Sequence, residues 1–140
     1  MKQIYSLLDH TADIGIKVRG KTYPELFVNA ASGMFEVMGY FAKEIKRGSQ
    51  RELTISLKAN NMDELLHDWL SELLSLSDAR GLIFNKFEIK KIDERAMTAA
   101  VSGAARNQFT FERDIKAVTY HNLKIQQRGG QYYVEIIFDV

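Results

Sequence analysis

Hydrophobic and polar residues alternate in several short stretches of the chain, which is typical of strands with one buried face. The clearest stretches are residues 13–19, where Asp13 begins the polar face, and residues 52–58. Residues 82–91 and 95–103 show the same alternation on either side of a short polar turn. These last two stretches therefore predict a hairpin.

Two other stretches repeat their hydrophobic residues at the spacing of an amphipathic helix. The first follows Thr22 and Glu25, which have the spacing of a capping box, and it contains Pro24 in its first turn. We expect this helix to stop at Gly39. The second begins at Asn61, and its wide leucine-rich stripe must pack against a sheet or another helix.

The last third of the chain predicts two further strands. Residues 104–114 have no clear period and predict a loop. Residues 118–125 predict a strand whose hydrophobic phase slips by one across residues 121–122, which indicates a β-bulge. A Gly-Gly pair at residues 129–130 predicts a hairpin turn into a final strand over residues 133–140.

The order of these elements is strand, helix, strand, helix and then four strands. This order predicts the α+β class, as a two-layer sandwich in which a largely antiparallel β-sheet carries two helices packed on one face. No linker rich in proline, glycine or serine interrupts the 140 residues. Residues 1–140 are therefore expected to form a single domain.

Composition narrows the class of function without identifying it. The chain has 19 basic and 18 acidic residues, a formal net charge of +1, which gives no electrostatic footprint for nucleic acid. It has no cysteine, which excludes disulfides, thiolate metal ligands and cysteine nucleophiles. It shows no signal peptide and no apolar run of membrane-spanning length, so we expect a soluble, cytoplasmic protein with no membrane partner.

Acidic groups near the two ends of the chain form the first candidate site. Asp139 precedes Val140, whose free α-carboxylate adds a second negative group, and Asp13 joins them if the first and last predicted strands are neighbours. Such a set of oxygen ligands suits a divalent cation such as Ca²⁺, Mg²⁺ or Mn²⁺. The alternative is that Asp13 caps a turn and Asp139 is a solvated strand end.

Three single residues are further candidates. His10 lies in a short polar insertion, where it could act as a base, bind a ligand or anchor the loop. His121 falls at the predicted bulge, where side chains are re-aimed. Lys116 could meet a phosphate, offset the acidic cluster or lie on the surface. The sequence contains no P-loop, nucleophile elbow or convincing Ser/His/Asp arrangement, so its motifs predict no enzyme.

Motifs near both ends of the chain resemble the signatures of the archease family. Residues 9–15 read DHTADIG, and residues 116–121 read KAVTYH, followed by IIFDV at residues 136–140. Between them, residues 20–27 read GKTYPELF, and the leucine-rich helix contains Trp69. The resemblance covers essentially the whole chain, and two separated motifs in order are far more specific than either one.

The resemblance implies an accessory protein and not a stand-alone enzyme. Archeases act with RtcB-type RNA ligases, which join RNA ends in tRNA splicing and RNA repair and form a covalent guanylate from GTP with Mn²⁺. The family member promotes that step and permits multiple turnover, so this chain would meet GTP and tRNA through the ligase. Carried over by position, the family's divalent-cation site falls on Asp13, Asp139 and Val140.

Three further positions match the motifs, and the resemblance implies supporting or partner-facing roles for them: His10, Lys116 and His121. One segment departs from the family's pattern. Residues 103–111 lack a glutamate and a histidine that members often carry ahead of the KAVTYH block. Any partner contact that depends on those two residues is therefore in doubt for this chain.

Two other classes of function stay open. The chain could be a chaperone or modulator of a tRNA-modifying enzyme, such as a methyltransferase, which would need binding but no metal. It could also bind RNA directly, although a net charge near zero and the lack of a clear aromatic and basic platform argue against this class.

Overall fold

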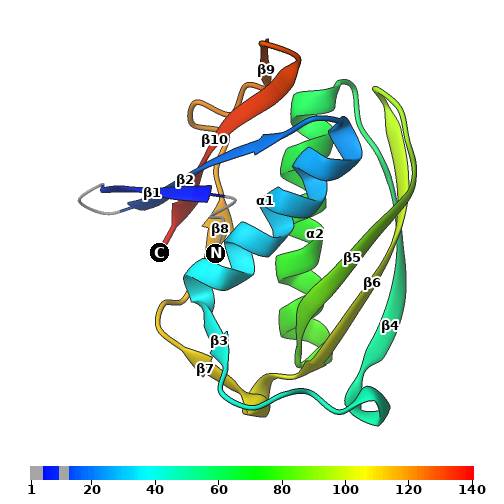
Figure 1. Cartoon of the computed structure of the whole chain (residues 1–140), viewed down its shortest axis with the longest axis vertical. Coiled ribbons are helices and arrows are strands. Elements are labelled where there is room, and N and C mark those ends of the chain that lie inside the picture. Colours follow the sequence, from blue (N-terminus) through cyan, green and yellow to red (C-terminus); the bar gives the residue numbers. More distant parts are fainter. Residues whose placement is uncertain (1–4, 10–12) are drawn as a thin grey trace.

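The computed structural model describes residues 5–9 and 13–140, and within them two helices combine with three antiparallel sheets (Figure 1). The largest sheet follows the order β1-β2-β10-β8, and β9 pairs with the opposite end of β10 from β8. Its strands are β1 (Tyr5–Asp9), β2 (Asp13–Gly20), β8 (Ala117–Val118), β9 (Gln126–Arg128) and β10 (Gln131–Asp139). Strand β10 is therefore held from both sides.

The remaining strands form two smaller sheets. The three-stranded sheet has the order β4-β6-β5, and β3 and β7 form a separate two-stranded ribbon. Their bounds are β3 (Gly39–Phe41), β4 (Arg51–Lys58), β5 (Leu82–Ile92), β6 (Ala96–Ala105) and β7 (Phe109–Phe111). The antiparallel pairing of β5 with β6 confirms the predicted hairpin.

Both predicted helices are present, as α1 (Tyr23–Met38) and α2 (Met62–Arg80). Their predicted caps are confirmed, because the side chains of Thr22 and Asn61 each accept a hydrogen bond from the backbone N–H three residues later, at 3.2 and 2.8 Å. Helix α1 ends at Gly39, as expected. Within the described residues, neither helix combines the length and the hydrophobicity needed to cross a membrane.

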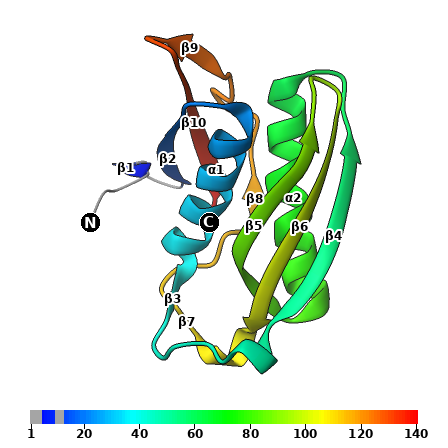
Figure 2. The same cartoon turned by 45° about the vertical axis from the view of Figure 1, so that its right-hand side comes forward.

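The helices lie between the five-stranded sheet and the three-stranded sheet (Figures 1 and 2). Helix α1 contacts β2 and β5, and α2 contacts β4, β5 and β8. Trp69 of α2 is fully buried, and its indole N–H donates to the carbonyl oxygen of Phe27 in α1 at 3.0 Å. Replacing a buried tryptophan by alanine typically costs about 3–5 kcal/mol, so we expect the whole Trp69 side chain to contribute strongly to the core.

The α+β class, with two helices and mostly antiparallel sheets, is confirmed. The strands are divided among three sheets, and the helices are covered by strands on two sides instead of packing on one face of a single sheet. The physical reason lies in α1, whose buried residues extend around much of its circumference. They are Leu26, Phe27, Ala30, Ala31, Gly33, Met34, Phe35, Val37 and Met38. So wide an apolar surface needs two covering layers.

Two predictions for the last third of the chain are wrong. Residues 104–114 are not a loop throughout, because a 3₁₀ turn at Arg106–Gln108 leads directly into β7. Residues 118–125 are not one bulged strand, because β8 ends at Val118 and a turn with Asn122 at φ 57° follows. Asparagine tolerates this left-handed conformation. The turn shifts the hydrophobic phase and allows Leu123 to be buried.

Candidate functional site

The ladder between β2 and β10 brings Asp13 directly opposite Asp139. This confirms the expectation that the strand of Asp13 and the last strand are neighbours. Directly opposite residues in an antiparallel pair have Cβ atoms about 4.5–5.5 Å apart and point to the same face of the sheet. The two carboxylates therefore start from neighbouring positions on one face. Asp13 is half-buried and Asp139 is exposed.

Along this face, one pair of opposing residues carries opposite charges and the pair at the end of the ladder carries like charges. Glu135 lies opposite Lys17, which is a favourable cross-strand pair, whereas Asp139 lies opposite Asp13. Like charges directly opposite one another are destabilising in a sheet. In the part of the chain that the structure describes, no ion pair involves either aspartate. The end of the ladder thus carries an acidic pair that no basic side chain of residues 5–9 or 13–140 joins in an ion pair.

Residues 116–120, which contain β8 and form the β8 segment, lie along the other edge of β10. The backbone N–H of Lys116 donates to the carbonyl oxygen of Asp139 at 2.8 Å, and Ala117 lies opposite Asp139 in the register. The backbone N–H and the hydroxyl of Thr119 both donate to the carbonyl oxygen of Ile137, at 3.0 and 2.9 Å. Lys116 is therefore fixed beside the acidic pair through its backbone, and its side chain is exposed.

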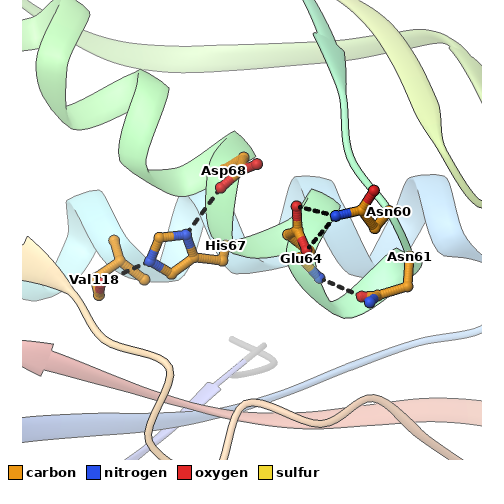
Figure 3. Close-up of polar contacts among 6 residues, drawn as sticks. All are labelled: Asn60, Asn61, Glu64, His67, Asp68 and Val118. Carbon is orange, nitrogen blue, oxygen red and sulfur yellow. Dashed lines mark hydrogen bonds and ion pairs between the residues drawn. The ribbon is translucent and has the colours of Figure 1, made fainter.

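His67 ties this segment to helix α2 (Figure 3). Its Nε2 lies 2.9 Å from the carbonyl oxygen of Val118, and its Nδ1 lies 3.0 Å from Oδ1 of Asp68. Both facing atoms are acceptors, so the doubly protonated ring makes both hydrogen bonds and the neutral ring makes one. The His67 ring also stacks on the ring of Tyr120, with centroids 3.7 Å apart.

Tyr120 is the most exposed large hydrophobic side chain in the described part of the chain, at 59%. Partial burial of its hydroxyl raises the pKa of Tyr120, and the negative charges of Asp68 and Glu64 raise it further. His67 and Tyr120 were not among the site residues predicted from the sequence. His67 gave no stronger signal than a polar residue at the edge of a helix's packed face, and Tyr120 belonged to a strand prediction that is wrong.

The other candidates are dispersed. His121 is exposed in the turn after β8, and its backbone N–H donates to the hydroxyl of Thr119 at 3.2 Å. His10 lies outside the described residues. Val140 follows the end of β10 and is 39% exposed. The structure thus brings together Asp13, Asp139 and the backbone of Lys116.

The acidic pair offers only part of the ligand set of a divalent cation. Among the residues that the structure describes, no group of three or more His, Cys, Asp or Glu side chains is arranged to hold a metal ion. Asp13 and Asp139 supply two carboxylates, whereas Ca²⁺ takes about 6–8 oxygen ligands. The two carboxylates are hard oxygen donors of the kind that such cations accept, but they supply only a minority of the ligands that Ca²⁺ takes.

The fold and the site define a small α+β protein with an acidic pair on its largest sheet. Residues 5–140 match the model of the archease protein family. Protein archease of Methanosarcina barkeri is 37% identical over 142 residues, which cover 97% of this chain and 95% of that protein. The chain belongs to the archease family.

Solved structures support the same fold. The solution structure of protein 1598 of Methanobacterium thermoautotrophicum is similar with a TM-score of 0.77 and 28% identity, covering 99% of this chain and 100% of that one. The crystal structure of a Thermotoga maritima archease, described as a possible chaperone, has a TM-score of 0.67 and 23% identity. It covers 95% of this chain and 94% of that one.

Proposed function

We propose that this chain is an accessory protein of an RtcB-type RNA ligase in tRNA splicing or RNA repair. In this role it promotes GTP-dependent guanylylation of the ligase and permits multiple turnover, and the ligase carries out the chemistry. Membership of the archease family supports the proposal. The observation that carries it is the cross-strand pairing of Asp13 with Asp139 at the end of β10.

A divalent cation is part of the proposal. Asp13, Asp139 and the terminal carboxylate of Val140 would hold Ca²⁺, Mg²⁺ or Mn²⁺ by oxygen ligands alone. Such an ion supplies positive charge that can neutralise phosphate oxygens and orient them. All three cations accept carboxylate oxygens as ligands.

The residues of this chain would position the cation and the groups around it. The paired strands β2 and β10 hold the two aspartates on one face, and the hydrogen bond from Lys116 to Asp139 fixes β8 beside them. Sites built on paired strands are more precise than sites on loops. The Lys116 side chain is exposed and is free to meet a phosphate or an acidic group of the ligase. His10 and His121 are proposed as supporting or partner-facing residues.

The test is a pre-steady-state assay of ligase guanylylation with the wild type, Asp13→Asn and Asp139→Asn. Each variant keeps the side chain's size and removes one negative charge. We expect each to reduce stimulation of the guanylylation rate at least about tenfold, the usual lower range for disturbing a metal site. Glu94→Gln, at an exposed glutamate in the turn between β5 and β6, is the matched control and should stimulate like the wild type.

Three results would contradict the proposal at different levels. Full stimulation by both aspartate variants would remove the cation site but leave the ligase partnership intact. Full stimulation in the presence of a chelator that spares the ligase's own Mn²⁺ requirement would favour a metal-independent role as a chaperone or modulator. No stimulation of any ligase by the wild type would overturn the accessory function itself.

A further inference from the structure

A second site lies where α1 ends and turns into β3. A pocket of ≈ 220 Å³ opens there between the end of α1, the β3–β7 ribbon and the first half of β5. None of the residues that line it belongs to the acidic pair or to the β8 segment. Figures 1 and 2 show the ribbon below the end of α1 and beside the three-stranded sheet. The inference drawn from this pocket is independent of the proposed function.

Two irregular backbone features form the pocket. A Cβ atom on Gly39 would lie 2.0 Å from the carbonyl oxygen of Thr110, so only glycine allows β3 to approach β7 this closely. The register between β5 and β6 shifts between Phe84 and Lys86, which leaves Asn85 as the extra residue of a bulge. Bulges re-aim side chains and are frequent next to binding sites. Asn85 is part of the pocket wall.

Aromatic rings make up most of the remaining wall. The rings of Phe35 and Phe87 are stacked, with centroids 6.1 Å apart and an interplanar angle of 15°. The rings of Phe41 and Phe109 meet edge to face at 5.0 Å. Phe35 is buried at the base, whereas the other three rings are only partly buried. Aromatic faces carry partial negative charge, so they attract a cation placed over them.

Glu36 adds a full negative charge to this aromatic wall. Desolvation raises the pKa of its carboxyl group. Within residues 5–9 and 13–140, no Lys, Arg or His side chain lines the pocket, and no ion pair includes Glu36. Glu36 is only partly desolvated and remains exposed, so its negative charge is available to a cation that enters the pocket. The negative charge of the pocket suits a cationic group. Its aromatic walls suit a group that is flat and weakly hydrated.

We infer that this pocket binds an arginine side chain of a partner protein. A guanidinium group stacks on aromatic rings and forms a two-pronged hydrogen bond with a carboxylate, whereas a lysine ammonium is a strongly hydrated point charge. Asn85 adds an amide oxygen that can accept another guanidinium N–H. The volume of ≈ 220 Å³ lies below the roughly 300–1,000 Å³ of typical small-molecule sites, which suits a single side chain.

The experiment compares two compounds that differ only in charge. Nα-acetyl-arginine amide and Nα-acetyl-citrulline amide are titrated into the full chain, and binding is followed by NMR shifts of Glu36, Asn85 and Phe87. Citrulline keeps the shape of arginine and replaces its charged group by a neutral urea. We expect arginine to bind at least about fivefold more tightly, as a partly desolvated cation–π contact and ion pair together allow.

Two matched variants show whether the preference for arginine over citrulline arises in the pocket. Glu36→Gln should reduce arginine affinity about fivefold and leave citrulline affinity unchanged, because it removes the charge and keeps the shape. Glu25→Gln makes the same change in the first turn of the same helix, away from the pocket, and should bind like the wild type. Folding of each variant is checked by its amide spectrum.

Three outcomes would overturn the inference. Equal affinity for arginine and citrulline would show that charge plays no part. An arginine preference that survives Glu36→Gln would place the binding elsewhere. Tighter binding of guanosine 5′-monophosphate than of the arginine compound, with shifts at the same residues, would identify the pocket as a nucleobase site.

Discussion

Acidic side chains are placed in two unusual environments in this protein. Asp13 and Asp139 face one another at the end of a ladder, and Glu36 stands among aromatic rings without a basic partner in the described residues. Elsewhere on the same ladder, Glu135 faces Lys17, so opposite charges are paired where no special role is evident.

The pH dependence of stability provides a test of the environment of Glu36. Its pKa is raised above the ordinary value of 4.5, so the folded state holds this proton more tightly than the unfolded state. The resulting stabilisation is complete below the ordinary pKa and is lost as the pH rises through the raised value. We expect Glu36→Gln to gain stability relative to the wild type between about pH 4 and pH 7.

Urea unfolding at several pH values measures this difference directly. The effect is small because much of the Glu36 side chain remains in contact with solvent. Glu94→Gln, at the exposed turn between β5 and β6, should show no such trend and serves as the control. A difference between the wild type and Glu36→Gln that stays constant with pH would contradict the expected desolvation of this carboxyl group.

Residues whose partners lie close in sequence were predicted correctly. Thr22 and Asn61 were identified as helix caps because each bonds a backbone N–H only three residues away. His67 was not identified, because its decisive partner is the carbonyl oxygen of Val118, which is remote in sequence. No local pattern reports such a contact.

At the scale of elements, the β8 segment depends on side chains for its position. Strand β8 has only two residues, and a strand this short gains little from its own ladder. His67 and Thr119 attach the segment to α2 and β10. The segment carries Lys116, whose backbone N–H bonds Asp139, so its attachment controls the position of Lys116 beside the acidic pair.

Substitution of His67 tests this attachment. We expect His67→Leu to lower the free energy of unfolding by about 1–2 kcal/mol, since it leaves the Val118 carbonyl without its side-chain donor. The amide hydrogens of Lys116 and Thr119 should exchange faster, while those of α2 should change much less. His121→Leu makes the same change at an exposed turn position and should affect neither quantity. Unchanged exchange at Lys116 and Thr119 in His67→Leu would show that the bond does not hold the segment.

Long periodic elements were predictable and short paired ones were not. The two helices and strands β2, β4, β5, β6 and β10 have enough residues to show their period. The ribbon of β3 and β7 pairs three residues with three, and β8 pairs two residues with β10. Such short pairs form because the surrounding structure brings them together, so their own sequence contains little signal.

At the scale of the whole molecule, both candidate sites are assembled from distant parts of the chain. The adjacency of Asp13 and Asp139 was a condition stated from sequence, but only the sheet order establishes it. The arginine pocket was not predicted at all, because α1, β3, β5 and β7 each contribute only a few of its residues. The arrangement of the strands and helices therefore determines which residues meet at each site.

Extension of the chain beyond Val140 tests the proposed role of the terminal carboxylate. A short tag after Val140 converts that carboxylate into an amide and removes one proposed ligand. We expect the tagged protein to stimulate ligase guanylylation at least about tenfold less than the untagged protein. The same tag at the N-terminus is the control, and removing the C-terminal tag with a protease that leaves only Val140 should restore stimulation. Equal stimulation by all forms would exclude the terminal carboxylate as a ligand.

The pairing of β2 with β10 also determines the order in which the molecule can form. Strands β4, β5 and β6 and helix α2 are consecutive, so their contacts close short loops, whereas β2 must find a partner near the opposite end of the chain. Folding is slower when more of the contacts join segments that are remote in sequence. We expect the β2–β10 ladder to form after the consecutive unit, so that the acidic pair is completed late in folding.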